Sequence, residues 1–139
     1  MAGYSGRSLS QKLGIKAGFT VAVIEPPANY RELLDPLPEG LRFCTEREDP
    51  DLIHYFCTKR EPLARDLPRL RKLMRDNATL WISWPKKSAQ LPTTVTENTV
   101  REIALPLGLV DNKVCAVDEI WSGLRLVVRL VHRATGKKC

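Results

Sequence analysis

Six successive residues, Phe-Thr-Val-Ala-Val-Ile at 19–24, constrain the fold of this chain more than any other segment. Apolar and β-branched side chains fill nearly every position, so the segment has no polar face. Such a strand is typical of a parallel sheet that is covered on both sides. Gly18 precedes it and Pro26-Pro27 ends it. The chain is therefore predicted to contain a buried, mostly parallel sheet.

Further strand-like and helical segments alternate along the chain. The other predicted strands are 41–44, 51–57, 79–84, 109–117 and 123–131, and the predicted helices are 8–13, 29–34, 66–75 and 94–105. Ser8 is the expected N-cap of the first helix and Gly14 its C-terminal stop. Pro68 does not fit a helix interior, so a short turn and a break are expected before residue 66. Thr94-x-x-Glu97 has the form of a capping box.

This alternation predicts right-handed crossovers and a mostly parallel sheet. A short turn at 118–122 would join the last two strands as an antiparallel hairpin. The expected fold class is α/β: a three-layer, Rossmann-like sheet of about six strands with an antiparallel closing hairpin. Its order resembles a reduced S-adenosylmethionine (SAM)-dependent methyltransferase fold. We expect one domain over 1–133 and a flexible tail over 134–139.

Composition supports a globular domain in a reducing compartment. The chain has 139 residues, 43% of them hydrophobic and 27% charged, enough for one domain with its own core. No apolar run approaches the length of a membrane helix, and the start lacks the apolar core of a signal peptide. A cytoplasmic location without a membrane partner is therefore expected. Four widely spaced cysteines without a C-x-x-C pair are interpreted as free thiols, and no metal site is predicted.

A formal net charge of +6 admits nucleic acid or other anionic partners. Much of the excess lies on the predicted helix 66–75 and just before it, at Arg65, Arg69, Arg71, Lys72 and Arg75. A solvated helix face explains these residues equally well. The nine aromatic residues do not cluster as in a base-stacking platform. Nucleic-acid binding is possible but not favoured.

Ligands of open parallel sheets bind beyond the carboxyl ends of the strands, near the point where strand order reverses. Cofactor-binding Rossmann domains place a glycine-rich turn after the first strand, where bare amides approach the ligand. Here that position holds Pro26-Pro27, which fix φ and lack amide donors. We therefore expect no nucleotide or methyl-donor cofactor bound in the usual way.

Two unusual segments supply the candidate site at the same sheet edge. Ser83-Trp84-Pro85-Lys86-Lys87 offers a hydroxyl, an indole and two ammonium groups to an anion, or is a strand exit with a packed tryptophan and solvated lysines. Asp118-Glu119-x-Trp121 offers paired carboxylates, or is a hairpin turn whose acids pair with Lys86 or Lys87. The candidate ligand-binding residues are Ser83, Trp84, Lys86, Lys87, Asp118, Glu119 and Trp121.

No nucleophile and base are expected to meet. Ser83 is predicted to lie without a histidine nearby, and His54 is interpreted as a core residue within a strand. Cys57 ends a strand near Lys59 and Arg60, whose charges would lower its pKa and allow a reactive thiol.

Several segments together resemble a bacterial family known as domain of unknown function 3052. They are Gly3-Tyr4-Ser5-Gly6, residues 12–16, residues 80–87 with Trp-Pro-Lys-Lys, and residues 114–124 with Asp-Glu-Ile-Trp-Ser-Gly. The resemblance spans nearly the whole chain and implies a bacterial cytoplasmic protein. The family has no assigned activity, so it implies no catalytic residue.

Three functions follow as hypotheses. The first is a non-catalytic module that binds an anionic small molecule or a protein partner at the strand-exit edge. The second is a divergent methyltransferase-like enzyme, which the Pro26-Pro27 loop argues against. The third is a weak nucleic-acid binder.

Overall fold

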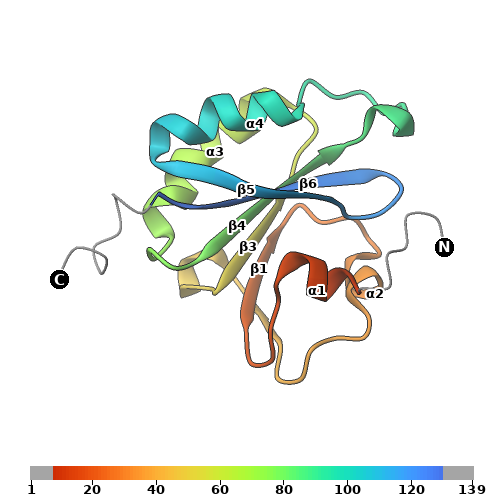
Figure 1. Ribbon diagram of the computed structural model, residues 1–139, viewed down its shortest axis with the longest axis vertical. Coiled ribbons are helices and arrows are strands. Elements are labelled where there is room, and N and C mark those ends of the chain that lie inside the picture. Colours follow the sequence, from red (N-terminus) through yellow and green to blue (C-terminus); the bar gives the residue numbers. More distant parts are fainter. Residues whose placement is uncertain (1–7, 130–139) are drawn as a thin grey trace.

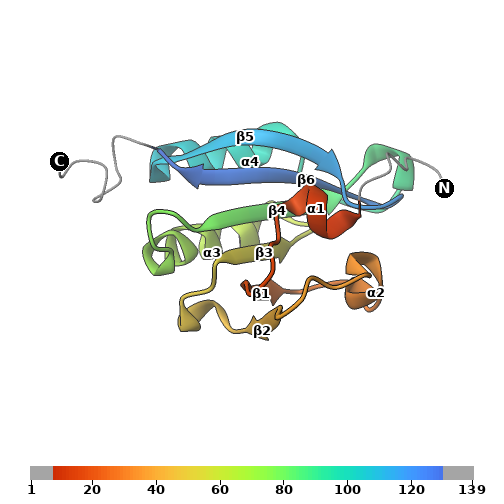
Figure 2. The same ribbon diagram turned by 60° about the horizontal axis from the view of Figure 1, so that its bottom comes forward.

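The computed structural model describes residues 8–129. It contains a six-stranded sheet with helices on both faces. The strand order is β2-β1-β3-β4-β6-β5, which Figure 2 shows from bottom to top. The strands are β1 (Thr20–Ile24), β2 (Arg42–Cys44), β3 (Leu52–Phe56), β4 (Thr79–Pro85), β5 (Leu109–Ala116) and β6 (Trp121–Val128). The strands β1 to β4 pair in parallel, and β6 runs antiparallel to β4 and β5. The predicted fold class is confirmed.

Two helices cover each face of the sheet. The helices are α1 (Leu9–Leu13), α2 (Tyr30–Leu34), α3 (Arg60–Leu73) and α4 (Glu97–Ala104). Figures 1 and 2 show α3 and α4 on one side of the sheet and α1 and α2 on the other. Short 3₁₀ turns occupy Glu46–Glu48, Lys87–Ala89 and Leu105–Leu107. The predicted tail, 134–139, lies outside the described residues.

The start of α1 follows the sequence prediction. Ser8 Oγ accepts from the Gln11 amide at 3.2 Å, and the Gln11 side chain accepts from the Ser8 amide at 3.1 Å. Gly14 ends the helix with φ at 81°, a conformation that glycine adopts without a Cβ clash.

The predicted break before Pro68 is wrong, because α3 runs through this residue without interruption. Leu63, Leu67 and Leu70 lie fully buried along the inner face of α3. A proline inside a helix costs about 3 kcal/mol, which the burial of three leucines offsets. Pro68 itself is on the exposed side, where water can bond the carbonyl left without a partner.

The predicted capping box at Thr94 and Glu97 is also wrong. The cap of α4 is formed two residues later, where Thr96 Oγ1 accepts from the Thr99 amide at 3.3 Å and Thr99 Oγ1 accepts from the Thr96 amide at 3.1 Å. The hydroxyl of Thr94 instead accepts from the amide of Arg60 at 2.7 Å. It thereby satisfies one of the open amides at the start of α3.

Two hydrophobic clusters fill the interior, one on each face of the sheet. The cluster under α3 and α4 contains Tyr55, Leu80, Ile82 and Trp84. The cluster under α1 and α2 is centred on Trp81, whose indole Nε1 donates to the carbonyl of Leu13 at 2.9 Å. These clusters hold the strands firmly, so the loops at their carboxyl ends have a fixed frame.

Asp51, just before β3, joins several groups at the edge of the sheet where the parallel strands begin. Its carboxylate accepts from the Thr20 amide at 2.8 Å and pairs with Arg75, which follows α3. Arg75 also donates to the carbonyl of Asp49 at 3.0 Å. Burial raises the pKa of Asp51, but the hydrogen bonds from Thr20 and Arg75 outweigh it and hold that pKa below its usual range. We call this region the strand-entry edge.

Candidate functional site

The loops that follow the parallel strands meet at one edge of the sheet, which we call the strand-exit edge. They are residues 25–29 after β1, 57–59 after β3, 86–96 after β4 and 117–120 between β5 and β6. The chain passes from β1 to β2 on one side and later to β3 on the other side, so strand order reverses beside β1. This is the position at which open α/β sheets bind ligands.

A groove of about 420 Å³ opens at this reversal point, and we call it the switch-point groove. Phe56 and Trp121 form part of its apolar wall, and their rings meet edge to face at 5.1 Å. Glu25, Lys59 and the Arg65–Asp66 ion pair supply charged groups to it. The groove therefore offers apolar surface together with charges of both signs.

The loop after β1 lacks the features of a phosphate-binding turn. Glu25 has φ at 55°, in the left-handed region that glycine normally occupies. Pro26 and Pro27 follow, and neither has an amide proton. The next helix, α2, has an acidic residue, Glu32, in its first turn and no side-chain cap. These residues give an approaching anion few backbone donors.

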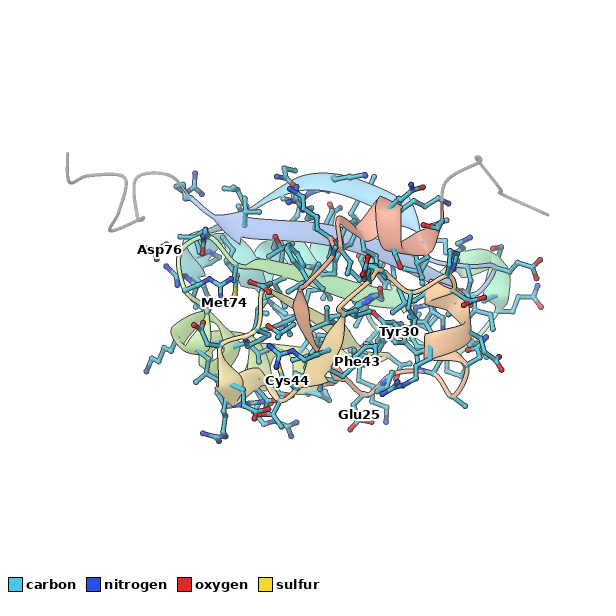
Figure 3. The ribbon with its side chains drawn as sticks, turned by 90° about the horizontal axis from the view of Figure 1, so that it is seen from below. Glu25, Tyr30, Phe43, Cys44, Met74 and Asp76 are labelled. Atoms are coloured by element: carbon cyan, nitrogen blue, oxygen red, sulfur yellow. The ribbon has the colours of Figure 1, made fainter. Side chains whose placement is uncertain are left out.

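A second groove of about 540 Å³ lies on the other side of this loop, between α2 and the end of β2. Its wall includes Pro26, Tyr30, Phe43 and Cys44. The guanidinium of Arg31 stacks over the Phe43 ring, with Cζ 4.3 Å from the ring centroid. Figure 3 shows Tyr30, Phe43 and Cys44 close to one another, with Glu25 at the lower margin.

The structure brings five of the seven predicted site residues together at the strand-exit edge. The Lys86 amide donates to the Ile120 carbonyl at 2.8 Å, which holds the loop after β4 against the hairpin turn. Trp121 pairs with Pro85 in the β4–β6 ladder and lines the switch-point groove. Lys86, Asp118 and Trp121 are half-buried, and Lys87 and Glu119 are exposed.

The ion pair between the hairpin acids and the lysines, one of the alternatives that the sequence left open, does not form within residues 8–129. Asp118 Oδ1 accepts from the amides of Ile120 and Trp121 at 2.9 and 2.7 Å, which fixes the hairpin turn. Within residues 8–129, neither Lys86 nor Lys87 has an acidic side chain within salt-bridge distance.

The other two predicted site residues, Ser83 and Trp84, lie inside the protein. Trp84 packs in the cluster under α3 and α4. Ser83 points to the opposite face, and its hydroxyl lies 2.8 Å from His54 Nε2. The prediction that Ser83 lacks a nearby histidine is therefore wrong, whereas His54 is the core residue that the sequence indicated.

Ser83 and His54 belong to a buried relay that continues to Tyr30, whose hydroxyl lies 2.8 Å from His54 Nδ1. His54 and Ser83 have no solvent exposure, and burial lowers the pKa of His54 to about 3. The imidazole is therefore neutral and accepts from one hydroxyl while it donates to the other. Phe56 stacks on it with ring centroids 4.3 Å apart, which separates it from the switch-point groove.

The hypothesis that basic neighbours activate Cys57 is wrong. Burial raises the pKa of this thiol to about 12, because the side chain is enclosed and the nearby lysine and arginine are solvated. The thiol therefore stays protonated near neutral pH.

Four arginines of α3 and of the residues just after it are engaged within the fold. Arg65 pairs with Asp66 at 3.0 Å, and Arg69 pairs with Glu46 at 3.0 Å. Arg71 donates to the Leu107 carbonyl at 3.2 Å, and Arg75 belongs to the strand-entry edge. This pairing weakens the hypothesis that the helix binds nucleic acid, because these charges have internal partners.

Two structural features are absent from the part of the chain that the structure describes. Among residues 8–129, no group of three or more His, Cys, Asp or Glu is arranged to hold a metal ion. No helix in the same range is long and apolar enough to cross a bilayer.

Solved structures of methyltransferases share this fold. A SAM-dependent methyltransferase from Aquifex aeolicus has a TM-score of 0.65 at 18% identity, over 86% of this chain and 88% of that chain. Magnesium protoporphyrin IX methyltransferase from Synechocystis, with bound SAM, has a TM-score of 0.54 at 9% identity, over 86% and 74%. Ribosomal protein L11 methylase from Lactobacillus delbrueckii has 0.53 at 11%, over 87% and 75%. At these identities the likeness shows the fold alone.

No protein-family model and no curated protein matches the chain. The resemblance to domain of unknown function 3052 therefore stays a prediction.

Sequence reasoning missed the buried relay and the groove beside α2. His54 and Ser83 lie on adjacent strands, and the register pairs His54 with Trp81, two residues before Ser83. Alternation places Trp81 and Ser83 on the same face as His54. The missing information was therefore the register between β3 and β4.

Proposed function

We propose that this protein is a binding module that holds an anionic ligand, or an acidic segment of a partner, at the strand-exit edge. The observation that carries the proposal is a set of cations without acidic partners. Lys59 and Arg60 follow β3, and Lys86 and Lys87 follow the adjacent β4. Within residues 8–129 none of the four has an ion pair, whereas Arg65, Arg69 and Arg75 of the α3 region are paired.

A rigid frame supports these four cations. The hydroxyl of Thr93 donates to the Thr58 carbonyl at 2.8 Å, and the Thr94 amide donates to the same oxygen at 2.9 Å. Thr94 also caps the start of α3, and Lys86 is bonded to the hairpin. The loops after β3 and β4 are thus linked, so binding an anion between them costs little ordering.

Trp121 and the switch-point groove add an apolar part to the charged binding surface. The half-buried indole of Trp121 offers an apolar wall in the groove that Lys59 also lines. Asp118 contributes by fixing the hairpin turn, since its carboxylate is already bonded to two amides. The favoured ligand therefore has an anionic group and an apolar part.

Two observations favour binding over catalysis. The Ser83–His54 pair has the spacing of a nucleophile and a base, but both groups are fully enclosed. The Cys57 thiol is protonated near neutral pH because burial raises its pKa to about 12. A substrate in the switch-point groove would reach neither His54 nor an ionised thiol.

The alternative is a divergent methyltransferase, which the shared fold favours. The residues after β1 do not fit the usual cradle for a coenzyme, because Pro26 and Pro27 supply no amide donors. The fold is therefore compatible with this activity, but its usual cofactor-binding loop is replaced.

The test of the proposal is a titration of ¹⁵N-labelled protein with a hexaglutamate peptide at constant ionic strength. We expect amide shifts to concentrate at residues 58–60 and 86–88. The double variant Lys86→Gln/Lys87→Gln should weaken binding about tenfold or more, since two charge-assisted contacts are removed. The matched control Lys16→Gln/Lys72→Gln, which removes two exposed charges elsewhere, should bind as the wild type does. Equal binding by both double variants would reject the site.

A calorimetric titration with SAM tests the alternative. We expect no heat of binding at micromolar protein. Micromolar affinity, with shifts at residues 25–28, would overturn the proposal in favour of the enzyme.

A further inference from the structure

Two cations face each other in the middle of the β5–β6 hairpin. Lys113 on β5 and Arg125 on β6 are direct partners in the antiparallel ladder, and Arg125 is also the partner of Trp81 on β4. Directly opposed residues point to the same face of a sheet, and like charges at such positions are destabilising. The strand register thus places a repulsive pair on the face that α1 covers in part.

Arg125 has a buried donor without an acceptor. Its Nε is inaccessible to solvent and has no hydrogen-bond partner, although the residue as a whole is half-buried. No acidic side chain in residues 8–129 pairs with Arg125 or with Lys113. A buried donor without a partner costs about 1–3 kcal/mol, which adds to the cost of the two opposed charges.

A third cation, Lys12 at the end of α1, lies in the same place. The ammonium of Lys113 donates to the Lys12 carbonyl at 3.1 Å, which joins β5 to the last turn of α1. Burial raises the pKa of the Cys115 thiol, and the positive charges of Lys113 and Lys12 act to lower it. The bond to the carbonyl occupies one proton of Lys113 and leaves the net charge of the cluster at three positive units.

We propose that Lys12, Lys113 and Arg125 form a second anion site, which takes a phosphate group. A phosphate dianion has several acceptor oxygens in a compact tetrahedron, so it can contact a guanidinium and two ammonium groups together. It would relieve the repulsion between the positive charges of β5 and β6.

This site is separate from the strand-exit edge and does not depend on the function proposed there. Lys113 and Arg125 lie within strands, and Lys12 lies on α1, whereas Lys86 and Lys87 lie in a loop after β4. Figure 2 shows α1 beside the β5–β6 hairpin.

The test is a titration of the ¹⁵N-labelled full chain with inorganic phosphate, at constant ionic strength set with chloride. Amides at 12–14, 112–114 and 124–126 should shift together and saturate with one dissociation constant. Arg125→Gln should weaken this constant about tenfold or more. Lys12→Gln, at the end of a short helix, should weaken it less and keeps the test valid if Arg125→Gln fails to fold. Lys72→Gln is the matched control and should bind phosphate as the wild type does.

Two titrations, with inorganic phosphate and with O-phosphoserine, distinguish the possible sources of the phosphate group. If the site holds free phosphate, inorganic phosphate will bind at least as tightly as O-phosphoserine. If it holds a phosphorylated molecule, O-phosphoserine will bind more tightly. Shifts confined to 58–60 and 86–88, or affinity unchanged in both Arg125→Gln and Lys12→Gln, would overturn the proposal without affecting the strand-exit site.

Discussion

The two edges of the sheet use charge in opposite ways. At the strand-entry edge, Asp51 and Arg75 pair with each other, the Thr20 amide donates to Asp51, and Arg75 also donates to the Asp49 carbonyl. At the strand-exit edge, Lys86 and Lys87 have no acidic partner within residues 8–129, and Asp118 is bonded to backbone amides. The charged groups of the first edge bond to one another and to the backbone, whereas the lysines of the second edge remain available to solvent and ligands.

This difference follows from the direction of a parallel sheet. Loops at the carboxyl ends of the strands surround the reversal point and form a groove, whereas the chain turns at the opposite edge have only to join strands to helices. A charge at the entry edge therefore contributes to stability, and a charge at the exit edge is free to contribute to binding. Mutations at the two edges should separate these effects.

The largest expected effect is a loss of stability at the entry edge. Asp51→Ala should lower the free energy of unfolding by about 2–3 kcal/mol, because it leaves the Thr20 amide and Arg75 without their acceptor. Urea unfolding measures this loss, and Asp51→Asn, which keeps one acceptor oxygen, should lose less. A change below about 0.5 kcal/mol for Asp51→Ala would show that the edges do not differ in this way.

Acid should lower the free energy of unfolding through His54, which lies in the interior between the two edges. Its folded pKa is about 3, below the value of 6.5 expected when unfolded, so the unfolded chain binds a proton that the folded chain does not. Stability should therefore fall as pH drops below 6.5, by roughly 2–3 kcal/mol at about pH 4.5.

Asp51 and Asp66 have lowered pKa values, so their contribution is lost only at lower pH, as they protonate. Urea unfolding between pH 6.5 and 4.5 thus isolates His54 from the entry edge. His54→Gln, which carries no charge, should remove the slope. A slope of equal size in this variant would assign the acid sensitivity to other groups.

A smaller effect is expected at the link between the exit loops. Thr94→Val removes the acceptor for the Arg60 amide at the start of α3 and should lower the unfolding free energy by about 1 kcal/mol. Chemical unfolding measures the loss, and Thr94→Ser, which keeps the hydroxyl, serves as the control. If Thr94→Val and Thr94→Ser unfold alike, the hydroxyl does not support the frame.

The smallest expected effect on stability is at the exit lysines themselves. Lys86→Gln/Lys87→Gln should change the unfolding free energy by less than about 0.5 kcal/mol, because neither ammonium has a partner to lose within residues 8–129. Thermal unfolding checks this alongside the binding test. A large loss of stability would show that these lysines belong to the fold rather than to a binding surface.

Local signals predicted the elements well where one short segment decides the outcome. The apolar run of β1, the Ser8 cap and the Gly14 stop all depend on neighbours within a few residues, and the structure confirms them. The predictions failed where distant residues compete. Pro68 stays in a helix because three leucines pack against the sheet. Thr94 does not cap α4, because its hydroxyl accepts from the amide of Arg60, 34 residues away.

The candidate site shows the same division. The sequence placed Lys86, Lys87, Asp118, Glu119 and Trp121 at one edge, since strand ends follow from the element order. It did not place the Ser83 side chain, because one residue along a strand decides whether a side chain faces the core or the solvent. The register between β3 and β4 turned Ser83 inward toward His54.

The sequence by itself determined the class of fold, the order of its strands and helices, and the proline pair that replaces a glycine-rich loop. These properties arise from periodicity and backbone restriction, which are local. The tertiary structure alone decided which charges have partners, which histidine meets which serine, and which cations face each other on β5 and β6. Such pairings depend on strand register and burial, which are fixed only when all the elements pack together.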